Sequence, residues 1–401
     1  MTELLAPAGN PERLRWATAY GADAVYFGIE QFSLRSFAGN FDMDDARAGI
    51  EHLHRHGRRG YVTLNAYPFS DEIPDLVKAA VRLDEMGADA FIVADIGVLR
   101  ELRKLDLRAA IHISTQANSV NYQTILAYAD LGAKRVNLAR ELSIDEIEKI
   151  QSALQGSGME TEVFIHGSVC FSYSGRCAIS DYLTGRRANR GECTHPCRWQ
   201  YSLMEEKRPG EFLPVFEDER GSYLFNNKDL ALFKFVPRLV SSGVNSLKIE
   251  GRMKNAHYLA SVLPVYRAIL DNRPMPDSEA WMRLGRVDNR GFSFGFMKGS
   301  IDADDYETES ARYKSTSVWV ASTTDEVRDG CRICRVKNTV HAGERLELLT
   351  PDGSISEIVM PNAIPRTTGD SVDRAQNQDV IMLDMDLPAY SIVRRVKELQ
   401  D

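Results

Sequence analysis

The sequence contains no apolar run approaching the roughly 18–20 uninterrupted residues that a membrane-spanning helix needs. Its first nine residues lack the basic start and the long apolar stretch of a secretory signal peptide. Basic residues are not in excess, because the formal net charge is −8, which argues against indiscriminate coating of nucleic acid but leaves room for a local basic patch. We therefore expect a cytoplasmic protein with no membrane partner.

Two peptidase motifs are also missing. The sequence has neither HExxH nor G-x-S-x-G, and spacing alone identifies no Cys–His dyad. Cysteine is scarce, with six residues in 401, yet four of the six fall between Val169 and Cys197. In a reducing compartment, clustered thiols favour metal or redox chemistry over structural disulfides.

A repeated phrase organises the first two thirds of the chain. In it, a glycine and a small residue precede a short apolar run, and it occurs at Gly21–Gly28, Gly87–Asp95, Gly132–Arg140 and Gly243–Glu250. Glycine suits the left-handed end of a helix, and a continuous apolar run suits a buried parallel strand.

Four more short apolar runs lie between these phrases, at Leu4–Ala6, Tyr61–Asn65, Ala109–Thr115 and Glu162–His166. Amphipathic windows follow most of the runs. Eight strands alternating with helices over roughly 270 residues predict an α/β fold, a (β/α)8 TIM-type barrel. A doubly wound sheet is the alternative.

The pattern changes after the barrel. We predict the barrel over residues 1–274, with a cysteine-rich insert at 167–201, and a polar, glycine-rich connector over 275–310. Short strands separated by glycine turns then predict a small C-terminal β-barrel domain over 311–401.

Polar side chains recur at the predicted strand ends, where TIM barrels carry their reactive groups. They are Tyr26, Asn65, His112, Gln116, Asn118, Arg140, His166, Glu250 and Arg252. Any one of them could be a structural hydrogen-bonding group, but together they predict a pocket for a small anionic or heteroaromatic ligand. We assign catalytic roles to His166, Arg140 and Glu250, with His166 as acid or base, and substrate binding to the others and to Arg176 in the insert.

The clustered cysteines have the spacing C-x6-C-x15-C-x3-C, through Cys170, Cys177, Cys193 and Cys197. Zinc sites usually show two short-spaced pairs, whereas the larger core of an iron–sulfur cluster tolerates wider ligand separation. Spacing therefore favours an iron–sulfur cluster, with zinc and then plain reduced thiols as alternatives. Neighbouring arginines would offset the negative charge of four thiolates.

The two remaining cysteines, Cys331 and Cys334, lie in a predicted strand. Residues three apart in a strand point to opposite faces, so this pair is not expected to complete a zinc ribbon. We interpret both as buried structural cysteines.

A resemblance to a known family is carried by the block "EVFIHGSVCFSYSGRCAISDYLTGRRANRGECTHPCRWQY" and by the shorter stretches "ELLAPAGN", "GADAVYFG", "STQANSVN" and "SLKIEGRMKN". Over residues 1–273 the sequence resembles the collagenase-like peptidase family (peptidase family U, number thirty-two). The resemblance implies a 4Fe-4S cluster on Cys170, Cys177, Cys193 and Cys197. It is strongest to the bacterial branch that makes 5-hydroxyuridine at the wobble position of tRNA, with prephenate required in the pathway. Sister branches hydroxylate a ribosomal RNA cytidine or assist ubiquinone hydroxylation.

The resulting hypothesis is an RNA-modifying hydroxylase. Its implied partners are tRNA and the iron–sulfur assembly machinery, and prephenate is a possible co-substrate that Arg140 and Arg252 would grip by its carboxylates. The target base must leave its stack, and Tyr173, Tyr182, Trp199 and Tyr201 could stack splayed bases. A peptidase and a non-catalytic iron–sulfur scaffold are the alternatives.

Overall fold

The computed structural model describes residues 2–34, 40–170, 172–173, 176–199, 203–204, 212–213, 217–218, 221–222, 227–273, 275–301, 305–306 and 313–397. Contacts divide the chain into two compact units. The first comprises Met1–Thr18, Ala22–Lys254 and Asn289–Tyr313, and the second Ala19–Gly21, Asn255–Asp288 and Lys314–Asp401.

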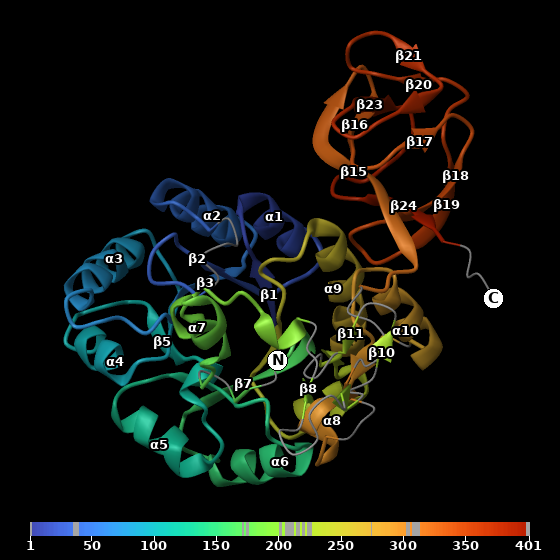
Figure 1. Cartoon of the computed structure of the whole chain (residues 1–401). Helices are drawn as coiled ribbons and strands as arrows, with labels where there is room; N and C mark the ends of the chain where they lie inside the picture. The colour runs from blue at the N-terminus through green and yellow to red at the C-terminus, as the bar shows by residue number, and fades with distance from the viewer. Residues whose placement is uncertain are drawn as a thin grey trace. The chain divides into compact units, whose positions relative to one another are not determined.

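The first unit contains a closed barrel of eight parallel strands (Figure 1). The strands are β1 (Glu3–Ala8), β2 (Ala24–Gly28), β3 (Arg59–Leu64), β4 (Ala90–Val93), β5 (Ala110–Ile113), β6 (Arg135–Asn137), β7 (Glu160–Gly167) and β13 (Ser246–Ile249). Neighbours pair in that order, and β13 closes the ring by pairing with both β7 and β1. The predicted TIM-type barrel is thereby confirmed, and the doubly wound alternative is wrong because the strand order returns on itself.

Helices follow the strands and surround them in the first unit (Figure 1). They are α1 (Pro11–Ala19), α2 (Met43–Arg55), α3 (Ile73–Glu85), α4 (Ile96–Leu102), α5 (Tyr122–Asp130), α6 (Ile144–Ala153) and α8 (Val236–Ser241). Local signals set where they begin: the side chain of Asp42 accepts the Asp45 N–H at 2.7 Å to cap α2, and Ser143 caps α6 in the same way.

The barrel interior contains charged side chains as well as the branched apolar residues that usually fill such barrels. Glu3, Arg135, Glu162 and Lys248 are all almost completely buried. Nη1 of Arg135 lies 2.6 Å from Oε1 of Glu3, and Nζ of Lys248 lies 2.8 Å from Oε1 of Glu162. Pairing lowers the cost of taking these charges out of water.

The chain leaves the barrel after β7 and forms the predicted cysteine-rich insert. The elements described within the predicted bounds of 167–201 are α7 (Ile179–Thr184) and two 3₁₀ turns (Ala188–Arg190 and Pro196–Arg198). Beyond these bounds come the strand pairs β8 (Leu203–Met204) with β9 (Phe212–Leu213) and β10 (Glu217–Asp218) with β11 (Gly221–Ser222). The next strand, β12 (Asp229–Ala231), pairs with β7 and with β14 (Phe292–Ser293). Part of the predicted connector therefore belongs to the barrel sheet.

The second unit combines two helices with antiparallel strands. Its helices are α9 (Ala256–Leu270) and α10 (Asp277–Gly285), and its main strands are β15 (Ser317–Arg328), β16 (Cys331–Val336), β18 (Arg345–Leu349), β19 (Ile355–Val359), β23 (Val380–Leu383) and β24 (Ile392–Val396). The six form one sheet in the order β19-β18-β24-β15-β16-β23. The second unit also contains two short pairs of strands. They are β17 (Val340–His341) with β22 (Arg374–Ala375), and β20 (Ile364–Pro365) with β21 (Ser371–Val372).

The contact-based division differs from the sequence-based boundaries. Residues 255–288 group with the C-terminal strands, and one reason is that Arg394 on β24 donates to Oγ of Ser261 on α9 at 3.1 Å. The segment predicted as a connector contains α10, whose Ala280 and Leu284 are buried. No helix in the described ranges is long and apolar enough to cross a membrane.

Candidate functional site

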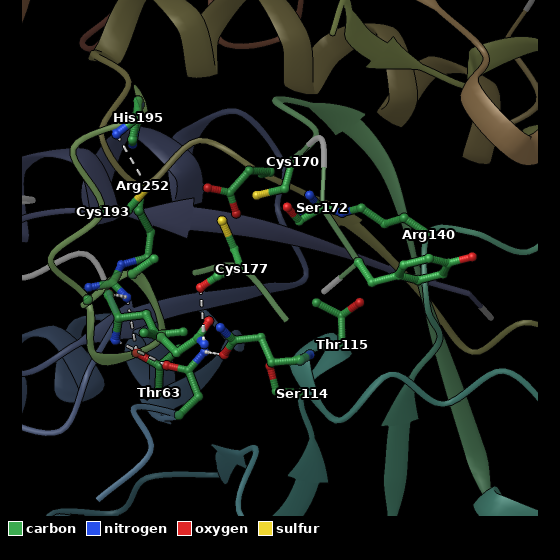
Figure 2. Close-up of a pocket in the computed structure, with 18 of the residues that line it drawn as sticks. Thr63, Ser114, Thr115, Arg140, Cys170, Ser172, Cys177, Cys193, His195 and Arg252 are labelled. Carbon is green, nitrogen blue, oxygen red and sulfur yellow. Dashed lines mark hydrogen bonds between the residues drawn. The ribbon is translucent and has the colours of Figure 1, made fainter. Parts of the chain in front are cut away.

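A cavity of about 550 Å³ is lined both by residues at the C-terminal ends of the barrel strands and by the cysteine-rich insert (Figure 2). All four clustered cysteines line it, as do six of the polar residues that the sequence placed at strand ends. These six are Tyr26, Asn65, Gln116, Arg140, Glu250 and Arg252. These six residues lie in or just after five barrel strands, and Ile92 on β4 and Phe164 on β7 also line the cavity. The fold therefore brings most of the barrel and the insert to a single space.

Tyr26 and Glu250 form one polar pair in the cavity wall. The Tyr26 hydroxyl lies 3.0 Å from the carbonyl oxygen of Ile249 and 3.2 Å from Oε2 of Glu250. Burial and the negative charge of Glu250 raise the pKa of Tyr26 well above its usual value. The phenol stays protonated at neutral pH and so can orient the Glu250 carboxylate.

Asn65 and Gln116 form a second pair, because Nδ2 of Asn65 donates to Oε1 of Gln116 at 3.0 Å. The hydroxyl of Tyr67 also donates to the Gln116 carbonyl oxygen at 2.9 Å. These bonds join the loop after β3 to the 3₁₀ turn after β5 and hold both amides at the cavity.

Arg140 reaches from the end of β6 toward Cys170 and Ser172 (Figure 2). Its Nη1 donates to the carbonyl oxygen of Ser168 at 3.1 Å, and its guanidinium carbon lies 4.0 Å from the centre of the Phe164 ring. The stacking and the hydrogen bond fix a cation next to the root of the insert.

Arg252 is buried, and its hydrogen bonds hold the segment that follows β2. Its Nη1 donates to the Leu34 carbonyl oxygen at 2.8 Å and to Oγ of Ser33 at 3.2 Å, and its Nη2 donates to Asn40. A side chain at Gly28 would collide with this guanidinium, which explains a glycine there. These contacts are those of a residue that positions a loop. Binding of substrate by Arg252 stays a prediction.

Two predicted histidines are buried outside the cavity wall. His112 lies inside the barrel with its ring 4.9 Å from that of Tyr61, and burial followed by the charge of Arg135 lowers its pKa well below the usual value. His166 on β7 has its ring 5.8 Å from Phe292, and burial lowers its pKa to about 3. Both imidazoles are therefore neutral near pH 7, and their predicted site roles remain untested.

Two further predicted residues also lie outside the wall. Asn118 ends the 3₁₀ turn Thr115–Ala117 in a left-handed conformation with φ of 53°. Arg176 is exposed on the insert. Asn118 therefore shapes the loop after β5, whereas Arg176 faces solvent.

The four cysteines that line the cavity form no disulfide bonds; Cys170 is exposed and the other three are partly buried. Their backbone is held from outside the insert and from within it: Nδ2 of Asn227 donates to the Cys170 carbonyl oxygen at 3.3 Å, and Nδ2 of Asn189 donates to that of Cys177 at 3.4 Å. The backbone N–H of His195 donates to Sγ of Cys193 at 3.4 Å. Such N–H···S bonds favour a thiolate.

The arrangement of these donors bears on the group they could hold. Within the described ranges, no three His, Cys, Asp or Glu side chains converge closely enough to bind a single metal ion. A zinc ion needs its thiolates at ~2.3 Å, whereas a cluster has a larger core and spaces its cysteines more widely. Four cysteines around one cavity have the donor chemistry of a thiolate-bound metal ion or cluster, and the predicted iron–sulfur cluster stays a prediction.

One anchor ties the insert to the loop before α3. Arg190 donates to both carboxylate oxygens of Glu72, at 2.9 and 2.6 Å, and to the Tyr67 carbonyl oxygen at 2.8 Å, with its guanidinium 4.2 Å from the Phe69 ring centre. The hydrogen bond from Arg190 lowers the pKa of Glu72 to about 2. The insert is therefore fixed over the cavity by a bidentate ion pair.

A second anchor comes from the predicted connector. Nη2 of Arg290 donates to Oδ1 of Asp229 and to Oγ of Ser168, both at 2.9 Å. Sequence reasoning missed Arg290 and Glu72, because nothing local marks a contact between residues more than 100 positions apart. It also missed Lys248 and Asn137, which line the cavity from strands; a lysine within an apolar strand was the available signal.

Comparison with known proteins gives one matching family model and several similar relatives. The sequence model of peptidase family U32 matches residues 9–306. A protein of Escherichia coli (strain K12) named tRNA hydroxylation protein P is 35% identical over 419 aligned positions, which cover 92% of this chain and 92% of that protein.

Two other relatives carry different names. A 23S rRNA 5-hydroxycytidine synthase of the same organism is 36% identical over 270 positions, which cover 67% of this chain and 39% of that protein. A protein of Porphyromonas gingivalis named collagenase is 30% identical over 312 positions, which cover 74% of this chain and 73% of that protein.

Proposed function

The chain belongs to peptidase family U32, and from this premise we propose that it is an RNA-modifying enzyme that hydroxylates the wobble uridine of tRNA. The observation that carries the proposal is the cavity in which four cysteines meet the polar strand ends of the barrel. The names of two relatives, one for tRNA hydroxylation and one for hydroxycytidine synthesis in rRNA, support a reaction on an RNA base.

We assign a 4Fe-4S cluster to Cys170, Cys177, Cys193 and Cys197, with zinc as the lesser alternative, and the iron–sulfur assembly machinery as a partner. When bound, the cluster would supply electron transfer. Hydroxylation replaces a C–H bond of the base by a C–OH bond and removes two electrons and a proton from the base. An external oxygen donor must supply the oxygen atom, and a cluster at this cavity would relay the electrons one at a time to an external acceptor.

The insert carries the side chains expected to meet the RNA. Tyr173, Tyr182 and Trp199 are exposed, while Tyr201 lies outside the described residues. A target base must leave its stack to enter the cavity, and exposed aromatic rings can stack the neighbouring bases meanwhile. Arg187 and Phe69 are both exposed, and the guanidinium carbon of Arg187 lies 5.4 Å from the centre of the Phe69 ring. A cation and an aromatic ring are therefore close enough together to contact one RNA strand.

Inside the cavity, Arg140 is the cation that we assign to a carboxylate of prephenate, the proposed co-substrate. Its guanidinium fork matches a carboxylate, whereas Arg252 already donates to neighbouring loop and strand atoms. Glu250, oriented by the Tyr26 hydroxyl, is the group placed to accept a proton in the cavity.

The proposal is tested by mass spectrometry of tRNA nucleosides from a strain that lacks this gene. We expect 5-hydroxyuridine and nucleosides derived from it to disappear, and to return when the wild-type gene is restored. Anaerobically purified protein should also be brown, with a broad absorption band near ~400 nm. Unchanged nucleosides together with bound iron would instead favour a non-catalytic iron–sulfur scaffold.

Peptide hydrolysis is the second candidate, because one relative is named collagenase. The geometry supports it less, since a cysteine peptidase needs one thiol with a base and not four around one cavity. We expect purified protein to leave collagen and gelatin intact, and cleavage that disappears in the Cys193→Ser variant would favour the peptidase.

A further inference from the structure

Two polar residues on the barrel strands line the cavity without a role in the reaction described so far. Lys248 on β13 and Asn137 on β6 are only 3% and 2% exposed. Both donate to the same oxygen, because Nζ of Lys248 and Nδ2 of Asn137 each lie 2.8 Å from Oε1 of Glu162. Glu162 therefore holds an ammonium group and an amide next to each other.

Each of the two groups has hydrogen-bonding capacity left over. An ammonium group has three N–H donors, and Glu162 takes one of those of Lys248. The Tyr26 and Phe164 rings, with centres 4.3 and 5.3 Å from Nζ, offer only their π faces. Oδ1 of Asn137 is buried and has no hydrogen-bond partner among the described residues.

The orientation of the Asn137 amide follows from its partner. A carboxylate can only accept hydrogen bonds, so the NH₂ group must face Glu162 and the oxygen must point elsewhere. Because both residues bind the same oxygen of Glu162, an N–H donor of Lys248 and the acceptor Oδ1 of Asn137 lie near each other in the wall of the cavity. A buried polar group usually has a partner, so a ligand that offers one acceptor and one donor side by side would complete both.

The fold alone does not account for this arrangement. Barrel interiors are usually filled by layers of Val, Ile and Leu, and replacing a buried ion pair by apolar residues is often neutral or stabilising. Lys248 and Glu162 thus cost desolvation without a clear return in stability. A ligand at the cavity supplies the reason to keep them.

We propose that Lys248 and Asn137 recognise the hydrogen-bonding edge of the base that enters the cavity, with Glu162 as the residue that positions both. A uracil presents this edge as a carbonyl oxygen, which accepts from Lys248, beside the N3–H, which donates to Asn137 Oδ1. A carboxylate offers only acceptors and would place an oxygen against Oδ1, so it fits this pair less well. The inference rests on the proposed function and names the residues that read the base.

The test measures binding of RNA to the full-length protein purified with its metal. The probes are two fluorescent single-stranded RNA heptamers, identical except that the central base is uridine or N3-methyluridine. We expect wild type to bind the uridine probe roughly tenfold more tightly, because methylation removes the donor and leaves Oδ1 unpaired. Fluorescence anisotropy reports both affinities.

Variants then assign the effect to the two residues. Asn137→Leu should bind the two probes equally, and Lys248→Met should weaken binding of the uridine probe by roughly tenfold. Ile92→Val, which alters an apolar residue of the same wall, should keep the wild-type preference. Melting temperature and iron content check that each variant is folded, and the comparison of the two probes on wild type needs no variant.

Equal binding of the two probes by wild type would overturn the inference. So would prephenate binding that needs Lys248 but not Asn137, since that outcome assigns the site to a carboxylate. The nucleoside analysis of the deletion strain tests hydroxylation separately. Unchanged nucleosides with the tenfold preference intact would refute the proposed function while supporting base recognition.

Discussion

The six cysteines occupy two regions with opposite surroundings. Four line the cavity at the barrel, where one is exposed and three are partly buried. Cys334 lies in the apolar core of the C-terminal unit, where burial raises the pKa of its thiol to about 12. Cys331 was also predicted to be buried, but that prediction is wrong, because Cys331 lies at the start of the same strand and is partly exposed. The comparison teaches that the surroundings, and not the residue type, separate a reactive thiol from an inert one.

Removing a cavity thiol should give the largest effect. Cys177→Ser is expected to lower iron content and tRNA hydroxylation by about 100-fold or more, because it deletes a proposed ligand outright. Iron analysis of purified protein and nucleoside mass spectrometry of a complemented deletion strain measure the two quantities. Cys331→Ser is the matched control, and equal loss in both variants would erase the distinction between the regions.

The rate of thiol alkylation should show the second-largest difference between the cavity cysteines and Cys334. In metal-free protein at pH 8, a maleimide is expected to label the cavity cysteines while Cys334 reacts only after unfolding. With its pKa raised to about 12, Cys334 carries on the order of a thousandfold less thiolate than an ordinary thiol. Peptide mass spectrometry assigns each label, and rapid labelling of Cys334 in folded protein would contradict its buried position.

Loosening the insert should give an intermediate effect. In the presence of a chelator, Arg190→Leu is expected to shorten the half-life of protein-bound iron by about fivefold. This factor is the size expected from losing one partly exposed ion pair with good geometry. Because the pKa of Glu72 is lowered to about 2, the pair is complete above about pH 4.5 and is lost as the pH falls through about 2.

Lys149→Met is the control, since it breaks a similar surface pair with Glu146 on α6, away from the insert. Unchanged iron retention in Arg190→Leu would show that the anchor between the insert and the loop before α3 does not position the cysteines.

The smallest effect is expected from the inert thiol. Cys334→Ser should lower the free energy of unfolding by about 1–2 kcal/mol, because a hydroxyl is placed in an apolar core. Iron content and hydroxylation should not change. Thermal denaturation measures the loss, and Cys331→Ser at the partly exposed face should stay within about 0.5 kcal/mol of wild type.

Much of the barrel was predictable because its signals are local. The run Tyr61–Asn65 predicted a strand that the structure has at Arg59–Leu64, and the phrase Gly132–Arg140 contains β6 (Arg135–Asn137). The strand predicted to contain Cys331 and Cys334 is β16 (Cys331–Val336). Glycine at a helix end and an apolar run leave traces within ten residues, so they can be read without knowing what packs against them.

The membership of the cavity was less predictable. By their positions on strands, His112 and His166 were predicted as site residues on the same grounds as Tyr26. In the structure both are buried outside the wall of the cavity. Lys248 and Asn137 belong to the wall, although each lay within a segment interpreted only as a strand. Which side chain of a strand faces the cavity depends on the tilt and stagger of all eight strands, and a short apolar run does not encode that.

By itself, the sequence determined that this protein alternates strands and helices, ends in a β-rich unit and gathers four thiols in one segment, because periodicity and spacing are properties of neighbouring residues. Only the tertiary structure decided that the thiols share a cavity with Tyr26, Arg140 and Glu250, and that Arg190 and Arg290 hold the insert there. Those contacts join distant parts of the chain, and closure of the barrel is the physical event that makes them neighbours.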